Sequence, residues 1–186
     1  MPLSMQTTLP PYEIRLASPA DAEQVALLGA QVFTSTYGNS IVAEDLQAYL
    51  DKNYTSTAVL ADIQDANKTI LVASDVNKRI IGYIYLTLGA SEACIANITN
   101  KIELERLYIL PSAHGMGVGR SLEREGETLG RKLGATHMWL GVWEHNVRAV
   151  HVYKHWGYSA VGQHMFTIGK TVQTDIVMLK KLEETI

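Results

Sequence analysis

The sequence predicts a single α/β domain, built on a mixed sheet with helices on both faces. Its 186 residues fit the roughly 100–200 residues of one domain, and no internal repeat or linker divides the chain. Strand-like and helix-like segments follow the order β-α-α-β-β-β-α-β-α-β-β, which is typical of such a sheet. We therefore expect one domain over residues 12–186, after a flexible lead over residues 1–11.

The composition argues against several classes of protein. The 16 Lys and Arg against 19 Asp and Glu give a net charge of -3, and without a basic run they do not indicate nucleic acid binding. The longest apolar-rich run, Ile80 to Ala90, is shorter than the roughly 20 residues of a membrane helix. The N-terminus does not resemble a signal peptide, and Cys94 has no second cysteine to pair with. We expect a cytoplasmic protein that does not bind a membrane.

The first part of the chain predicts one strand and then helices. Residues 12–16 alternate between polar and apolar types, as a short strand does. Ser18-Pro19-Ala20-Asp21 combines an N-cap residue, a first-turn proline and an early acid, and the helical apolar pattern that follows ends at Gly38. A second helix is expected from Ala43 and a weaker third over residues 57–65.

The rest of the chain predicts alternating strands and helices. Two β-branched runs separated by a short turn indicate a hairpin, and a second hairpin closes the chain. The expected strands are 69–74, 79–88, 101–110, 137–143, 158–167 and 171–179, and the expected helices are 117–133 and 146–156.

A glycine-rich turn joins strand 101–110 to the next helix. Glycines at positions 115, 117 and 119 let the backbone curl, so that successive N–H groups point at one spot. The helix adds its free N-terminal amides and its positive dipole end, and Arg120 adds a full charge. This arrangement predicts a diphosphate site; a tight turn that needs glycine only for its φ angles is the alternative. Neither the Walker pattern nor the GxGxxG pattern of dinucleotide sites fits the spacing.

Two motifs resemble signatures of the GNAT superfamily of N-acetyltransferases. His114-Gly-Met-Gly-Val-Gly119-Arg120 resembles Arg/Gln-x-x-Gly-x-Gly/Ala, with His114 in the position that is usually Arg or Gln. Farther along, the segment from Asn146 through Ala149, Tyr153 and Gly157 to Tyr158 resembles N-x-x-A-x-x-x-Y-x-x-x-G-F/Y. Two signatures in the right order are more specific than either alone, and the order of strands and helices resembles the family over nearly the whole chain.

The resemblance implies a GNAT fold, whose central, mostly antiparallel sheet is flanked by helices, and acetyl-CoA as the co-substrate. It also implies that the strand before the turn pairs with the pantetheine arm and supplies a backbone N–H to the thioester carbonyl. The implied cofactor-binding residues are Leu107, Tyr108, Ile109, His114 (through its own N–H), Gly115, Met116, Gly117, Val118, Gly119, Arg120, Asn146 and Tyr153.

Within the superfamily, two segments resemble PaiA-type spermidine/spermine acetyltransferases. They are Trp139-Leu-Gly-Val-Trp143-Glu-His-Asn146 and the C-terminal stretch from Phe166 to Asp175. This likeness implies a small primary amine, with a polyamine as the first candidate. A protein N-terminus, an amino acid or an aminoglycoside-like amine stays open, and so does a non-catalytic CoA-binding sensory module.

Tyr153 is the candidate general acid. The family places a tyrosine acid on this helix, and a phenol with a pKa near about 10 suits a departing thiolate. From periodicity alone a core tyrosine is the better interpretation, because Val150, Tyr153 and Trp156 recur at helical spacing. Asn146 could cap the helix, contact the cofactor, or do both.

Glu105 is the candidate general base. An alkyl ammonium has a pKa near about 10, so a positioned carboxylate must take its proton at neutral pH. Strand geometry puts Glu103 and Glu105 on one face, and Glu105 is preferred because it lies nearer the carbonyl donor. The alternative is that Glu105 pairs with Arg106 or with a neighbouring strand.

Substrate contacts are expected from the early helices. Tyr37, Tyr49, Glu44 and Asp45 could contact a cationic amine, although the two acids also suit a solvated helix start.

Two further features do not indicate chemistry. His151 and His155 have the spacing of a zinc pair, but the Glu of H-E-x-x-H and a third ligand are missing, so we expect no metal. Cys94 lacks the neighbours of an acyl relay, so we expect direct attack of the amine. The Tyr- and Trp-rich strands near the C-terminus could form the edge of a homodimer.

Overall fold

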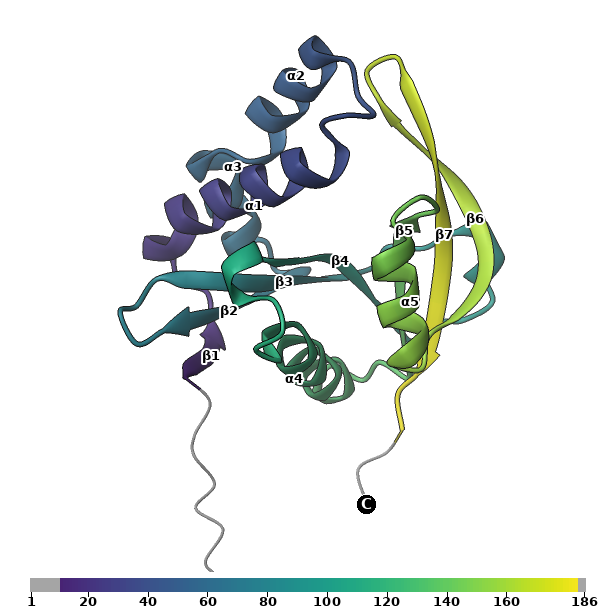
Figure 1. The fold of residues 1–186 in the computed structure, drawn as a ribbon. Helices are drawn as coiled ribbons and strands as arrows, with labels where there is room; N and C mark the ends of the chain where they lie inside the picture. Colours follow the sequence, from purple (N-terminus) through teal and green to yellow (C-terminus); the bar gives the residue numbers. More distant parts are fainter. Residues whose placement is uncertain (1–10, 184–186) are drawn as a thin grey trace, which may run out of the picture.

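The structure is a computed structural model that describes residues 11–183. It contains a seven-stranded sheet with helices packed against both faces (Figure 1). The mixed α/β architecture expected from the order of segments is therefore confirmed. Most of the predicted lead over residues 1–11 lies outside the described residues. In the described part of the chain, no helix combines the length and the apolar character needed to cross a membrane.

Every predicted strand and helix is present. The strands are β1 (Tyr12–Leu16), β2 (Lys68–Asp75), β3 (Ile80–Leu88), β4 (Lys101–Ile109), β5 (His137–Trp143), β6 (Ser159–Ile168) and β7 (Thr171–Lys181). The helices are α1 (Ala22–Tyr37), α2 (Ala43–Asn53), α3 (Ser56–Gln64), α4 (Val118–Lys132) and α5 (Val147–His155).

The first helix begins later than the pattern predicts. A separate 3-10 turn, Pro19–Asp21, precedes α1. The Asp21 carboxylate accepts the backbone N–H of Ser18 at 2.7 Å and the guanidinium of Arg15 at 2.7 Å. The residues that signal a helix start therefore hold this extra turn.

The two faces of the sheet carry different helices. Tyr83 of β3 points toward α1, where a Cβ added at Gly29 would clash with the Tyr83 hydroxyl. Its neighbour Ile84 points the other way, and a Cβ added at Gly126 of α4 would lie 3.1 Å from Ile84 Cδ1. Since successive strand residues face opposite sides, α1 to α3 cover one face, while α4 and α5 lie on the other (Figure 1).

The sheet opens between β4 and β5. The strand order is β1-β2-β3-β4-β5-β7-β6, and every neighbouring pair is antiparallel except β4 and β5, which are parallel. These two strands pair only at their starts, Lys101 to Glu103 with His137 to Trp139. Beyond that point β4 stays paired with β3, and β5 stays paired with β7. The separation leaves one edge of β4 without a neighbouring strand.

Candidate active site

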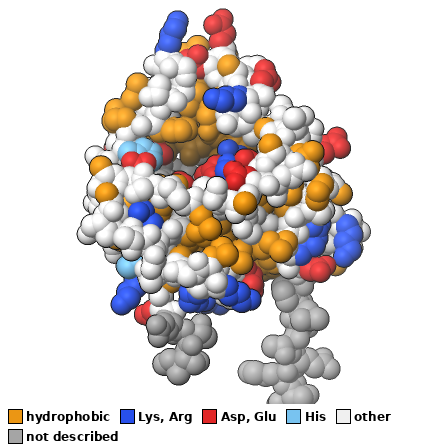
Figure 2. Space-filling view, turned by 180° about the vertical axis from the view of Figure 1, so that it is seen from behind, with side chains coloured by type: hydrophobic (Ala, Val, Ile, Leu, Met, Phe, Trp, Pro, Cys, Tyr) orange, Lys and Arg blue, Asp and Glu red, His pale blue; other side chains and the backbone are white. Residues whose placement is uncertain are grey.

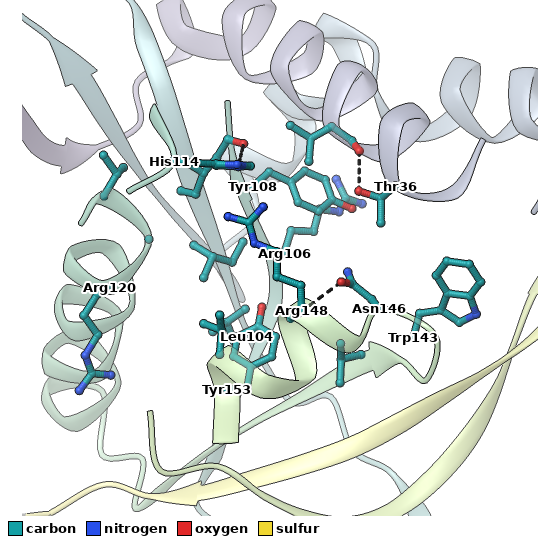
Figure 3. A pocket seen from close by; sticks show the side chains of 18 of the residues that line it. Thr36, Leu104, Arg106, Tyr108, His114, Arg120, Trp143, Asn146, Arg148 and Tyr153 are labelled. Atoms are coloured by element: carbon teal, nitrogen blue, oxygen red, sulfur yellow. Dashed lines mark hydrogen bonds between the residues drawn. The ribbon is translucent and has the colours of Figure 1, made fainter. Parts of the chain in front are cut away.

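A cleft of about 1190 Å³ fills the opening between β4 and β5. Its walls come from the free edge of β4, the glycine turn, the end of β5 and α5 (Figure 3). The predicted cofactor-binding residues all line this cleft except Met116, whose residue surface is 43% exposed. Sequence segments that are far apart in the chain are thus brought together as the two motifs predict.

The free edge of β4 presents backbone amides to the cleft. The N–H of Leu110 donates to the Ile81 carbonyl of β3 at 2.9 Å. Because successive N–H groups of a strand point to opposite edges, those of Leu107 and Ile109 face the cleft. The ring of Tyr108 lies on the other face of the sheet, where its hydroxyl is 2.9 Å from that of Tyr54. Tyr108 therefore contributes packing through its ring, as expected.

The turn after β4 requires glycine at two positions. Gly115 and Gly117 have φ of 80° and 81°, a region that side chains rarely adopt. Gly117 is the N-cap of α4, so the first amides of the helix lack acceptors within it and lie at the cleft. Gly119 has no positive φ, and an added Cβ would meet neighbours only at 3.6 Å. The turn therefore needs glycine for its φ angles at Gly115 and Gly117, and it also leaves the first amides of α4 free to bind an anion.

His114 differs from the expectation. Its backbone N–H donates to the Pro111 carbonyl at 3.2 Å, so the expectation that this N–H serves a phosphate is not supported. Its ring Nε2 lies 3.2 Å from the carbonyl of Ile109, at the end of the free edge (Figure 3). The ring thus holds the strand end against the turn.

Arg120 is neutralised by a neighbour within the protein. Its guanidinium donates to Glu123 at 2.6 Å and lies 5.4 Å from the centre of the Trp156 ring. Glu123 is fully buried and also accepts from Lys180 of β7 at 3.0 Å. In Figure 3 the Arg120 side chain runs along α4, away from the other labelled side chains.

Tyr153 of α5 and Asn146, the N-cap residue of that helix, line the cleft. The Asn146 side chain accepts the N–H of Ala149 at 3.2 Å, so it caps the helix as expected while also lining the cleft. The Tyr153 ring packs edge-on against Trp156 and Tyr158. Burial raises the pKa of the Tyr153 phenol well above its ordinary value, so the hydroxyl keeps its proton at neutral pH.

A β-bulge brings Glu105 and Arg106 to the same side. Pairing with β3 shifts register here, since Tyr85 faces Arg106 while Leu86 faces Leu104. Glu105 accepts the Thr87 hydroxyl at 2.6 Å and lies 3.3 Å from Arg106 and 3.6 Å from Lys68. Glu105 therefore forms the ion pair that the alternative interpretation expects. Its side chain nevertheless lines the cleft as well.

A smaller recess of about 190 Å³ lies beyond the bulge. It shares five residues with the cleft, so the two cavities meet: Tyr37, Glu105, Arg106, Tyr108 and Gly141. The rest of its lining consists of four aromatic side chains, two acids and one histidine: Phe33, Tyr49, Tyr54, Phe166, Glu103, Asp175 and His164. The surface seen from behind is hollowed near its centre, where acidic and basic side chains gather among hydrophobic ones (Figure 2).

Glu103 titrates unusually in this recess. Burial, followed by repulsion from Glu105 and Glu92, raises the pKa of its carboxyl from 4.5 to about 7. The folded chain thus keeps a proton that the unfolded chain loses between these two values. Stability consequently falls as the pH rises from about 4.5 to about 7.

Glu103→Gln removes this pH-dependent loss, because glutamine is neutral throughout. We expect the variant to exceed the wild type in free energy of unfolding by about 1–3 kcal/mol at pH 8, and to match it near pH 4. Urea unfolding at both pH values measures the difference. Glu13→Gln on β1, where the carboxylate is 62% exposed, is the matched control and should show no such dependence. Equal stability of Glu103→Gln and wild type at pH 8 contradicts the raised pKa.

Of the four residues that could contact a cationic amine, the two tyrosines lie at a cavity, and the two acids lie in the first turn of α2, as the alternative given for them describes. Tyr37 and Tyr49 line the recess, but Glu44 and Asp45 line neither cavity. The Asp45 carboxylate accepts the backbone N–H of Lys170 at 2.8 Å, which ties α2 to the turn between β6 and β7. Cys94 is exposed and also lines neither cavity. Within the described residues, no group of three or more His, Cys, Asp or Glu side chains could hold a metal ion.

Sequence reasoning missed several residues of the site. Arg148 lines the cleft from α5 (Figure 3), and its place inside the second motif is a signal. Asp175 and His164 line the recess with Gly141. An acid such as Asp175 within a strand can also indicate a functional residue, because strands seldom bury an acid. Only the register of the four strands shows that Asp175 lies at the same recess as His164 and Gly141.

Comparisons with known proteins agree with this geometry. The family model described as acetyltransferase (GNAT) family matches residues 38–158, a range that contains both motifs. A spermidine N(1)-acetyltransferase of Thermoplasma acidophilum is 27% identical over 174 residues, which cover 92% of this chain and 98% of that protein. An uncharacterized N-acetyltransferase of Mycobacterium tuberculosis is 29% identical over 162 residues, 87% of this chain and 98% of that protein.

A solved structure gives the same result for the fold. The PaiA N-acetyltransferase of Thermoplasma acidophilum, in complex with coenzyme A, matches with a TM-score of 0.73 and 25% identity. The match covers 91% of this chain and 98% of that chain. The mostly antiparallel sheet flanked by helices, which the two motifs imply, is therefore confirmed.

Proposed function

Since the chain belongs to the GNAT family of acetyltransferases, we propose that it transfers the acetyl group of acetyl-CoA to a primary amine of a small molecule. A polyamine is the first candidate, supported by the likeness to a spermidine acetyltransferase and to PaiA. The reaction is direct: the amine nitrogen bonds to the thioester carbonyl carbon, the carbon–sulfur bond breaks, the nitrogen loses a proton and the sulfur gains one.

The cleft has an anion site for the diphosphate of acetyl-CoA and a free strand edge for its pantetheine arm and thioester. Gly115, Gly117 and the first amides of α4 form the anion site for the diphosphate. The N–H groups of Leu107 and Ile109 face the free edge, where an extended arm can pair with them as an added strand. The same edge supplies the donor for the carbonyl oxygen as negative charge develops there.

The junction of the two cavities is the observation that carries the proposal. The cleft and the recess share Glu105, Arg106 and Tyr108 at the β4 bulge. An amine in the recess therefore reaches the same part of β4 that faces the cleft. Two reactants can meet there without an intermediate on the enzyme.

In this proposal one side chain accepts a proton and another donates one. Glu105 accepts the proton of the ammonium, and Thr87, Arg106 and Lys68 hold its carboxylate in place. Tyr153, on the opposite wall of the cleft, donates a proton to the departing sulfur. Burial raises the pKa of this phenol, so the hydroxyl is protonated before the reaction and can donate a hydrogen bond to the sulfur as the carbon–sulfur bond breaks.

Mass spectrometry tests the direct transfer. With acetyl-CoA and spermidine, we expect spermidine that carries one added acetyl group. With acetyl-CoA alone, the mass of the protein should stay unchanged. Acetylated protein that passes its acetyl group to amine added later would replace direct attack by a covalent intermediate.

A further inference from the structure

Four neighbouring strands each place one residue at the base of the recess. Glu103 of β4, Gly141 of β5, Asp175 of β7 and His164 of β6 lie on the same face of the sheet, since Asp175 pairs with His164 across β6 and β7. Gly141 leaves the middle open: an added Cβ would lie 3.1 Å from His164 Cε1 and 3.5 Å from Asp175 Oδ2. The recess thus extends past the bulge to Asp175.

The charges at this end of the recess are unbalanced. Arg106 is the one Arg or Lys among the described residues that line it, and it lies 3.3 Å from Glu105 and over the Tyr54 and Tyr85 rings. Within residues 11–183, the only ion-pair partner of Asp175 is His164, whose Nε2 is 3.7 Å away and whose Nδ1 lies 3.1 Å from a second acid, Glu92. Among the described residues, Asp175 Oδ1 is buried without a hydrogen-bond partner. A buried carboxylate in this state favours a cation beside it.

The walls of the recess suit a chain of methylene groups. Phe33 and Tyr49 are stacked with ring centres 4.8 Å apart, and Phe166 meets Tyr49 edge-on at 6.1 Å. Tyr37 continues this surface toward the cleft. Aromatic rings pack well against alkyl chains and attract ammonium groups through their faces.

We propose that Asp175, assisted by Glu103, is the specificity-determining residue that binds a second cationic group of the acceptor. The enzyme then selects acceptors in which a cationic group lies several methylenes from the reacting amine. This inference rests on the proposed function, because it places the reacting amine at the bulge and the other cation at the inner end of the recess.

Acceptor pairs of matched length test this selection. The ratio of kcat/KM for 1,4-diaminobutane to that for butylamine should be high in the wild type. It should fall about 10- to 100-fold in Asp175→Asn, and fall as well in Glu103→Gln. Since both acceptors are measured on one protein, loss of folded enzyme cancels in the ratio. Glu13→Gln removes a distant, exposed acid and should keep the wild-type ratio.

Direct binding separates this inference from the proposed function. N,N,N′,N′-tetramethyl-1,4-diaminobutane is protonated at both nitrogens near neutral pH and so keeps both charges, but its free tertiary amines carry no hydrogen and cannot form an amide. Calorimetry should show that it binds about tenfold or more weakly to Asp175→Asn than to wild type. An unchanged ratio and unchanged binding in Asp175→Asn overturn the inference, even where amines are acetylated. Binding that depends on Asp175, without thiol release from any amine, overturns the proposed function and supports the cation site.

Discussion

Tyr153→Phe is expected to lower kcat by about 100-fold or more while CoA binds with nearly unchanged affinity. The substitution removes one oxygen and leaves a ring that packs on Trp156 and Tyr158. The departing thiolate then lacks the phenol that is proposed as its proton donor. Steady-state kinetics with acetyl-CoA and an amine measures kcat, and calorimetry measures the CoA affinity.

Tyr158→Phe is the matched control for this substitution. Tyr158 belongs to the same aromatic group, but it does not line the cleft. Its variant should keep wild-type kcat. A collapse of CoA binding in Tyr153→Phe would show that Tyr153 is a structural residue, which is the interpretation that helical periodicity alone supports.

Gly117→Glu is expected to weaken CoA binding by about 100-fold or more. The residue has φ of 81° and begins α4, so the change adds backbone strain of about 1–3 kcal/mol. It also places a negative charge at the amides that would face the diphosphate. Calorimetric titration with CoA measures the loss.

Gly134→Glu is the control that separates the effect of backbone strain from the effect of a negative charge at the diphosphate site. Gly134 follows the other end of α4 with φ of 85°, and an added Cβ there meets nothing within 4 Å. This variant should lose similar stability and keep its CoA affinity. Unchanged affinity in Gly117→Glu would contradict the position of the cofactor.

The elements of the fold and the glycine turn could be predicted from local sequence. Strand and helix periods are local properties, and so is the need for glycine at positions 115 and 117. The cleft itself could not be predicted, because it depends on where β4 stops pairing with β5. That point is set by contacts between distant segments, which no local pattern records.

The acid–base residues show the same limit. Alternation correctly predicted that Glu103 and Glu105 share a face, but the bulge also brings Arg106 to that side. The ion pair of Glu105 follows from this shift of one residue. Met116 was also predicted to bind the cofactor, but only its neighbours in the turn line the cleft. Its own side chain is exposed.

The recess was beyond sequence reasoning for a different reason. Its base takes one residue from each of four strands, and two of them, Asp175 and His164, come from the C-terminal hairpin. Glu44 and Asp45 were the more obvious acids, because they lie on a predicted early helix. Asp45 instead binds the Lys170 amide and fixes the hairpin turn.

Thiol release from acetyl-CoA tests the central claim most directly. The panel contains spermine, spermidine, diamines, amino acids, aminoglycosides and short peptides, and CoA binding is measured by calorimetry on the same preparation. We predict release that requires a primary amine and is fastest with diamines or polyamines. Tight CoA binding without release from any amine would contradict the account and identify the protein as a CoA-binding module without turnover.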